Sequence, residues 1–209
     1  YPQEATQNGD NRFNDQLPND ISADFRGKAR AFYEKYQSEI QKVDRNTLND
    51  NDKASYDIFV YEMKMNLEGL TYPSWQMPFQ QFWGLPITMG QWASGESVQP
   101  FKTVKDYDDW LKRIDAFAIW SDTAIANFKT GITTGNVLPK SLVKKMIPQC
   151  RDLVSKEPTK SIFYGPINKM PKEFSANDRK RLTEAYTKAI AETVNPTFTK
   201  LTNFLQNEY

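Results

Sequence analysis

Carboxylates gather at two places in this 209-residue sequence, and paired carboxylates can perform acid–base chemistry. Asp50 and Asp52 form one group, and three aspartates within residues 106–109 form the other. Both groups fall where a helix is expected to begin, and acids in a first helical turn offset the helix dipole. An EF-hand calcium loop is disfavoured because its sixth position, counted from Asp50, is Ser55 instead of glycine. Helix capping therefore explains both groups better than catalysis.

The sequence lacks the residues of several common catalytic sites. It contains no histidine and one cysteine, Cys150. Zinc sites draw mainly on Cys and His, a serine triad needs a His base, and a disulfide needs a second cysteine. Cys150 follows Pro148 on an apolar-rich segment, which favours a buried small hydrophobe over a nucleophile. We expect no catalytic residue and no metal ligand within this chain.

The stretch TGITTGNVLPKSLVKK, residues 130–145, could be taken for a phosphate-binding loop. A P-loop has the spacing Gly-x-x-x-x-Gly-Lys-Ser/Thr, which directs backbone N–H groups and the lysine at phosphates. Here only three residues separate Gly131 from Gly135, and Asn136 follows. The pattern fits a connector in which Gly131 ends one helix, Gly135 turns the chain and Pro139 opens the next helix.

Residues 71–95 are rich in aromatic side chains but have no single period, and three prolines interrupt any long helix. The segment could anchor the core, or it could form the wall of a cleft for an extended substrate. Nucleic acid is a poor candidate ligand, because no Lys or Arg lies between Tyr72 and Phe101. The substrate-cleft candidates are Trp75, Gln81, Trp83, Gly84 and Tyr164.

These residues must be positioned by helices, since apolar side chains recur every three or four residues and no alternating strand pattern appears. The sequence predicts an all-α fold, an irregular multi-helix bundle with an aromatic-rich loop segment. Phe32, Tyr36, Ile58 and Tyr61 are expected to face inward. Helices are expected over residues 21–43, 50–67, 103–131, 139–154 and 175–205, with Gly69 as a C-cap, a kink at Pro148 and a kink or break at Pro196.

Composition suggests a flexible arm over residues 1–20, which are polar, followed by a single helical domain over residues 21–209. Neither a membrane-spanning run nor a signal peptide is visible. The chain opens on Tyr1 instead of Met and closes on Tyr209 within a helical pattern, so we expect it to be an N-terminal fragment of a longer protein.

Five sequence blocks occur in a characteristic order: LNDNDKASYDI (48–58), PFQQFWG (78–84), FKTVKDYDDWLKRI (101–114), GITTGNVLPK (131–140) and NPTFTKLTNFLQNEY (195–209). This order resembles the N-terminal part of the bacterial family known as domain of unknown function 885. The third block, with Asp106, Tyr107, Leu111 and Arg113, is similar to a helix of that family.

The family resembles helical zinc metallopeptidases, and many of its members resemble lipoproteins. The family's own His-Glu…His metal motif lies in its C-terminal half, outside the part that this chain resembles. The resemblance implies that this chain is the N-terminal scaffold and substrate-cleft portion of such a peptidase, inactive by itself. Zinc would belong to the full-length protein, the C-terminal catalytic half would be its partner, and a peptide its substrate. It further implies a lipid anchor upstream of residue 1 and a periplasmic or cell-envelope location, with the cytoplasm as the alternative.

Two other functions stay open. The chain could be a stand-alone helical binding or interaction module of the cell envelope. An enzyme that uses only carboxylates would need two acids with strongly shifted pKa values in one pocket.

Overall fold

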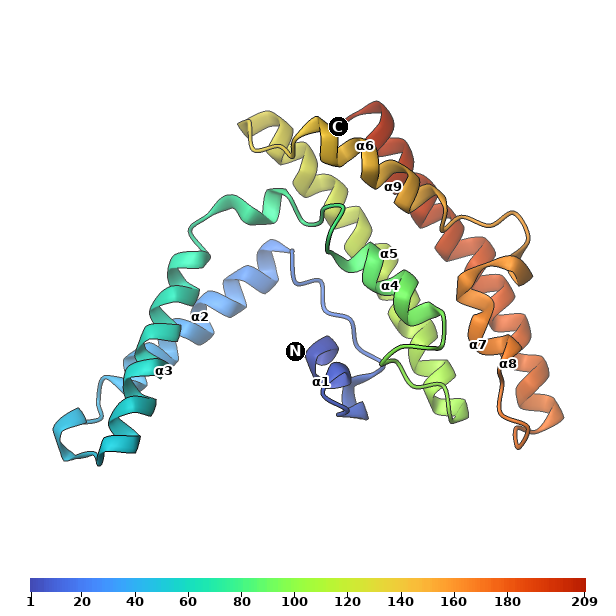
Figure 1. The fold of residues 1–209 in the computed structure, drawn as a ribbon. Coiled ribbons are helices and arrows are strands. Elements are labelled where there is room, and N and C mark those ends of the chain that lie inside the picture. The colour runs from blue at the N-terminus through green and yellow to red at the C-terminus, as the bar shows by residue number, and fades with distance from the viewer. The chain divides into compact units, whose positions relative to one another are not determined.

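The computed structural model describes residues 1–209 and is all-α, as the apolar periodicity predicts (Figure 1). Its only β-type pairing is an isolated antiparallel bridge between Gln80 and Trp83. The chain divides into two compact units, in place of the expected arm and single domain. Unit 1 comprises residues 1–19 and 76–209, and unit 2 comprises residues 20–75. No helix is long and apolar enough to cross a membrane.

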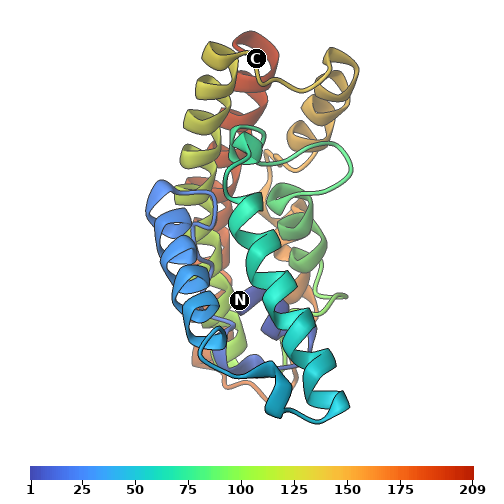
Figure 2. The same cartoon turned by 90° about the vertical axis from the view of Figure 1, so that its left-hand side faces the viewer.

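Unit 2 is a hairpin of helices α2 (Ala23–Ile40) and α3 (Asp50–Gly69), which pack on each other (Figure 2). Both helices begin at a side-chain cap. The Ser22 hydroxyl accepts a hydrogen bond from the backbone N–H of Phe25, and Asn49 Oδ1 accepts one from that of Asp52. The α3 helix ends at Gly69 with Leu70 as a right-handed C-cap, so the predicted glycine cap is wrong.

The hairpin has almost no buried core. Met63 is its one buried hydrophobic residue, and α2 has none. The prediction that Phe32, Tyr36, Ile58 and Tyr61 face inward is wrong, because all four are exposed. The spacing of apolar residues predicts which face of a helix is apolar, but it does not say how much of that face is covered. In a pair of helices each covers only a narrow strip of the other, so part of the apolar face stays exposed.

Unit 1 is built on the long helix α5 (Val104–Thr134), which packs against α8 (Ala176–Ala189) and α9 (Asn195–Asn207). Helix α6 (Lys140–Arg151) packs on α9 in turn. A capping box begins α5, since Thr103 and Asp106 exchange side-chain-to-backbone hydrogen bonds. Aromatic side chains dominate the core between these helices, including Tyr107, Trp110, Phe117, Trp120, Phe128, Phe163, Tyr186, Phe198 and Phe204.

One of the two connector glycines, Gly131, has a role different from the one predicted, whereas Gly135 turns the chain as expected. Helix α5 runs past Gly131, and Gly135 is the left-handed C-cap with φ +81°. Gly131 is buried, and a Cβ built there would lie 2.5 Å from the carbonyl oxygen of Asn136. Close backbone approach, not helix termination, therefore explains Gly131. Pro139 is the N-cap of α6, as the connector requires.

The predicted break at Pro196 is a π-helical turn, η6 (Ile190–Val194), between α8 and α9. A proline has no N–H and its ring clashes with the carbonyl four residues earlier, so widening the preceding turn lets the helical path continue. Asn195 fixes this point, because its side chain accepts from the N–H of Ser155 at 3.0 Å and donates to the Ser155 carbonyl at 2.8 Å. The segment leading to α8 contains short turns and α7 (Gly165–Asn168).

The N-terminal residues are structured, in contrast to the expected arm. Residues 2–7 form helix α1 (Pro2–Gln7), and Thr6, Asn14 and Leu17 are buried. Arg113 of α5, itself fully buried, binds this segment by donating to the carbonyls of Gln16 and others and to the Thr6 hydroxyl. Polar composition could not reveal this, because the segment is held by its backbone carbonyls.

Candidate binding cavity

A cavity of about 270 Å³ lies in unit 1 between α4 (Leu85–Ala93), α6 and the residues around Phe79. Its floor is apolar and buried, with Phe79, Met146 and Cys150 each at most 3% exposed. Pro86, Ile87, Leu153 and Ile162 add further apolar lining. The lining contains no charged residue. The cavity therefore suits an uncharged group.

The turn before α4 sets one side of the cavity. The Gln80 N–H donates to the Trp83 carbonyl at 3.0 Å, and Gly84 follows with φ +136° as the N-cap of α4. A Cβ at Gly84 would lie 2.3 Å from Phe79 Cβ, so only glycine fits here. The Phe79 ring is anchored in turn on the Phe128 ring of α5, with centroids 5.2 Å apart.

Three glutamine side chains, those of Gln80, Gln91 and Gln149, supply the polar part of the lining. Gln149 Nε2 donates to the Gln81 carbonyl at 3.0 Å and so ties α6 to the turn. The Gln81 Oε1 atom is buried without a hydrogen-bond partner. Amides both donate and accept hydrogen bonds, as a peptide backbone does.

Cys150 is the one thiol, and it lies in this cavity. Burial raises its pKa to about 12, so the thiol stays protonated near neutral pH. A protonated thiol is a poor nucleophile. The prediction of a buried, inert cysteine agrees with this environment.

The structure brings some of the predicted cleft residues together and separates others. Gln81, Trp83 and Gly84 share the turn beside the cavity, and the Trp83 side chain is 56% exposed. Tyr164 is buried on the turn that packs against α4, but it does not line the cavity. Trp75 belongs to unit 2, where the Arg26 guanidinium lies 4.2 Å from its ring centroid.

Sequence reasoning missed the residues that α6 contributes. Met146 and Cys150 recur at helical spacing, which indicates a buried face but not a cavity, and Gln149 lies beside them on the same helix. Nothing in the sequence pairs this helix with residues about sixty positions earlier. The i, i+3 and i+4 spacing could have placed these three side chains on neighbouring faces of one helix, but not opposite α4.

The carboxylate groups serve the fold. Asp108 forms an ion pair with Arg181, and the buried Asp109 contacts Lys105. Asp50 and Asp52 occupy the first turn of α3, as predicted.

A zinc site does not fit the residues of this chain. No group of three or more His, Cys, Asp or Glu side chains is placed to hold a metal ion, and the single thiol is buried and protonated.

The comparisons with known proteins agree with the motif order found in the sequence. No curated protein matches the chain. A family described as "Bacterial protein of unknown function (DUF885)" matches residues 2–209, which is almost the entire sequence. The chain therefore belongs to the DUF885 family of bacterial proteins.

Proposed function

We propose that this chain is the scaffold and substrate-cleft portion of a zinc-dependent peptidase, with the catalytic groups outside residues 1–209. The observation that carries the proposal is the uncharged cavity between α4 and α6, with its apolar floor and amide lining. In this proposal the floor binds an apolar side chain of a peptide, and the glutamines bind the peptide backbone.

The cavity is large enough for one side chain of a peptide, and this size supports the proposal. Pockets for drug-sized ligands measure roughly 300–1,000 Å³, and this cavity of about 270 Å³ falls just below that range. A charged side chain would lose its hydration there without gaining a partner, because no charged residue lines the walls. Leu- or Phe-sized side chains match these conditions.

The neighbouring turn supports an extended ligand. Phe82 is 72% exposed and Trp83 56% exposed, although large aromatic side chains usually find cover. Gln80 belongs both to this turn and to the cavity lining. A peptide with one side chain in the cavity could continue across these rings.

The remaining parts of the proposal come from the family resemblance. Zinc and the general base would be held by a C-terminal catalytic half, which would be the physical partner of this chain. A lipid anchor and a periplasmic or cell-envelope location belong to the same proposal. Cell fractionation of a host that makes the natural protein tests the location, and recovery in the cytoplasm contradicts it.

Cys150 offers a direct test of the cavity, because it is the only thiol in the chain. Its raised pKa makes the thiol slow to react near neutral pH, so the rate of modification is followed at mildly alkaline pH, where more of the thiol is ionised. We expect N-acetyl-phenylalaninamide to slow modification of Cys150 by a thiol reagent in a saturable way, and N-acetyl-lysinamide to leave the rate unchanged. Ile87→Trp should fill the cavity and abolish the protection. Ile119→Trp is the matched control, since Ile119 is exposed on α5 and does not line the cavity.

Two results would contradict the proposal. Equal protection by both amides, or by neither, would mean that the cavity does not select an apolar side chain. Hydrolysis of peptides by this chain with added zinc would mean that the chain is catalytic by itself. Binding of intact envelope proteins without binding of peptides would instead favour a stand-alone interaction module.

A further inference from the structure

A groove of about 890 Å³ lies in unit 1, between the end of α5, the first turns of α6 and the last turn of α9. It shares no lining residue with the first cavity, the one between α4 and α6. Its volume falls within the range of roughly 300–1,000 Å³ that is usual for ligand pockets. Three separate elements enclose the groove, so it is a concave site and not one bare face of a helix.

The groove has a largely apolar lining that solvent can reach. Its apolar residues come from α5, the connector between α5 and α6, α6 itself and α9, and include Ile132, Val137, Val143, Ile147 and Leu205. Ile132 is 42% exposed and Val137 is 49% exposed. A ligand with an apolar body would remove this surface from water, which is favourable in proportion to the area covered.

A hydrogen bond and a ring contact hold the walls of the groove together. The backbone N–H of Leu138 donates to the Tyr209 hydroxyl at 2.7 Å. The Tyr209 ring lies against the Phe128 ring of α5, with centroids 4.7 Å apart. These contacts join the connector, α5 and the end of α9, so the groove is formed before any ligand binds.

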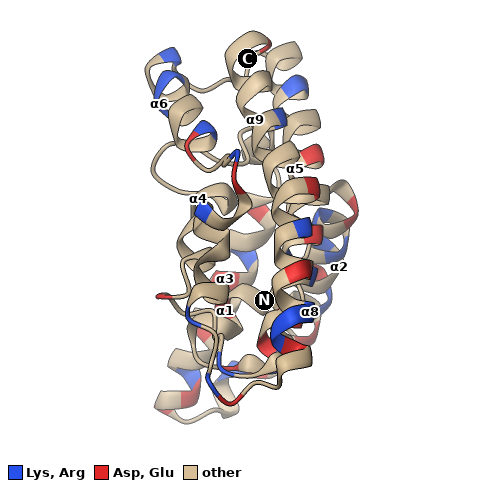
Figure 3. Cartoon of the chain, turned by 90° about the vertical axis from the view of Figure 1, so that its right-hand side faces the viewer, with Lys and Arg blue, Asp and Glu red and all other residues tan.

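Two lysines without acidic partners line the groove. Lys140 and Lys144 lie one turn apart on α6, and neither forms an ion pair. Helix α6 contains no Asp or Glu, and Figure 3 shows its basic segments. Glu208 is the one acidic side chain in the lining, and it already binds the Lys129 ammonium at 2.7 Å. Like charges four residues apart on a helix repel each other, so an anion between the two lysines would relieve this repulsion.

We propose that this groove binds a single-chain anionic amphiphile such as a fatty acid. The carboxylate lies between the ammonium groups of Lys140 and Lys144, and the hydrocarbon chain covers the apolar lining. A small anion alone would gain little from exposed lysines, and an uncharged apolar molecule would leave the two like charges unpaired. The site goes beyond the function proposed for the first cavity and does not depend on it.

The test is a calorimetric titration of the 209-residue chain with laurate, below the concentration at which laurate forms micelles. We expect saturable binding at a single site. Dodecyltrimethylammonium has a hydrocarbon chain of similar length and a positive head, so it should bind about tenfold more weakly. Laurate binding should survive Ile87→Trp, because that substitution fills only the first cavity.

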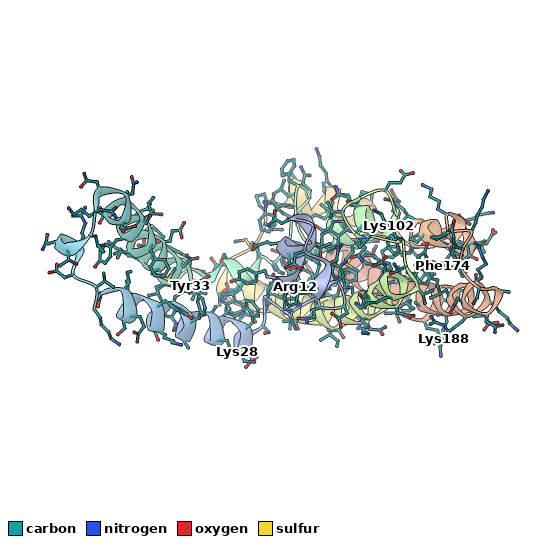
Figure 4. The ribbon with its side chains drawn as sticks, turned by 90° about the horizontal axis from the view of Figure 1, so that it is seen from below. Arg12, Lys28, Tyr33, Lys102, Phe174 and Lys188 are labelled. Carbon is teal, nitrogen blue, oxygen red and sulfur yellow. The ribbon has the colours of Figure 1, made fainter.

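Lysine variants separate the two groove lysines from other lysines of the chain. The double variant Lys140→Gln/Lys144→Gln should weaken laurate binding about three- to twentyfold, as expected for two solvent-exposed charge pairs. Lys145→Gln should leave binding unchanged, since Lys145 is exposed on the same helix but does not line the groove. Lys188→Gln on α8 is a distant control with the same change of charge (Figure 4). All four lysines are exposed, so the variants should unfold at the same denaturant concentration as the parent.

A pair of isoleucine variants tests the apolar part of the groove. Ile132→Glu should weaken laurate binding about tenfold or more, because it places a carboxylate where the hydrocarbon chain would lie. Ile119→Glu is the matched control and should leave binding unchanged. Both isoleucines are exposed on α5, but Ile119 does not line the groove.

Several outcomes would overturn the proposal. Equal binding of laurate and dodecyltrimethylammonium would mean that the lysines do not select the head group. Equal effects of Lys145→Gln and the double variant would mean that general charge, and not this groove, attracts laurate. Loss of laurate binding in Ile87→Trp would assign laurate to the first cavity. Failure of laurate to saturate would also overturn the proposal, and saturable binding of an acidic amphipathic peptide in its place would assign the groove to a protein partner.

Discussion

Units 1 and 2 are both made of capped amphipathic helices, yet they bury very different amounts of side chain. Unit 1 encloses a continuous set of aromatic rings, such as Phe117 against Phe198 with centroids 5.3 Å apart. Unit 2 buries one hydrophobic residue and leaves Phe32 and Tyr61 more than half exposed. Periodicity therefore predicts that a helix forms, whereas the number of neighbouring elements decides what it buries.

The largest expected contrast comes from removing a ring in each unit. Phe198 is fully buried against Phe117 and Phe163, so Phe198→Ala should cost about 3–5 kcal/mol of unfolding free energy. Phe32 is 53% exposed, so Phe32→Ala should cost about 1 kcal/mol or less. Denaturant titration followed by circular dichroism measures both. Equal losses would mean that the exposed aromatic residues of unit 2 are covered in solution.

Arginines provide the second contrast. Arg113→Leu should cost about 2–4 kcal/mol, because it leaves buried acceptors such as the Thr6 hydroxyl without a donor. Arg45→Leu removes a bidentate pair with Asp57 on the surface of unit 2, where solvent screens the charges, so it should lower the unfolding free energy far less than Arg113→Leu does. Arg113→Leu should also speed proteolysis within residues 1–19. An unchanged cleavage pattern there would show that Arg113 does not hold this segment.

Replacing a glycine by alanine should change the unfolding free energy in opposite directions in the two units. Gly84 has φ +136°, and an added Cβ there would collide with Phe79. Gly84→Ala should therefore destabilise the protein by about 1–3 kcal/mol. Gly27 lies inside α2, and no atom lies within 4 Å of the position of an added Cβ. Gly27→Ala should therefore stabilise the protein by about 0.5–1 kcal/mol. Melting temperatures of both variants test the signs. A stabilising Gly84→Ala would refute the tight turn beside the first cavity.

The smallest expected effect is a loss of stability at alkaline pH that arises from Tyr107 in unit 1. Burial raises the pKa of Tyr107 from 10.0 to about 12. Above pH 10 the unfolded chain loses this proton and the folded chain keeps it, so stability falls as pH rises from 10 toward 12. Tyr107→Phe loses the bond to the Pro166 carbonyl, which costs about 1 kcal/mol at neutral pH.

The same variant should lose less stability between pH 10 and 12 than the parent does. Denaturant midpoints at several pH values provide the measurement. Parallel pH profiles for parent and variant would mean that Tyr107 does not control this fall.

Features that depend on neighbouring residues, such as helix caps, can be predicted well from the sequence. The Thr103 and Asp106 capping box and the capped start of α8 at Ser175 follow from side chains within one helical turn. The cavity did not follow, because it depends on how α6 meets α4 across about sixty residues of chain. Arg113 was hidden for the same reason, since its partners in residues 1–19 are mostly backbone carbonyls.

The π-helical turn before Pro196 has a consequence for how this family can tolerate insertions and deletions. A π-helical turn holds about one residue more than an α-helical turn, so deleting one residue within Ile190–Val194 can return this turn to α-helical geometry while α9 keeps its orientation. Inserting one more residue there would instead rotate α9 by about 100°, which would carry Phe198 away from Phe117 of α5. Family members should therefore tolerate the loss of one residue between Tyr186 and Phe198 more readily than the gain of one.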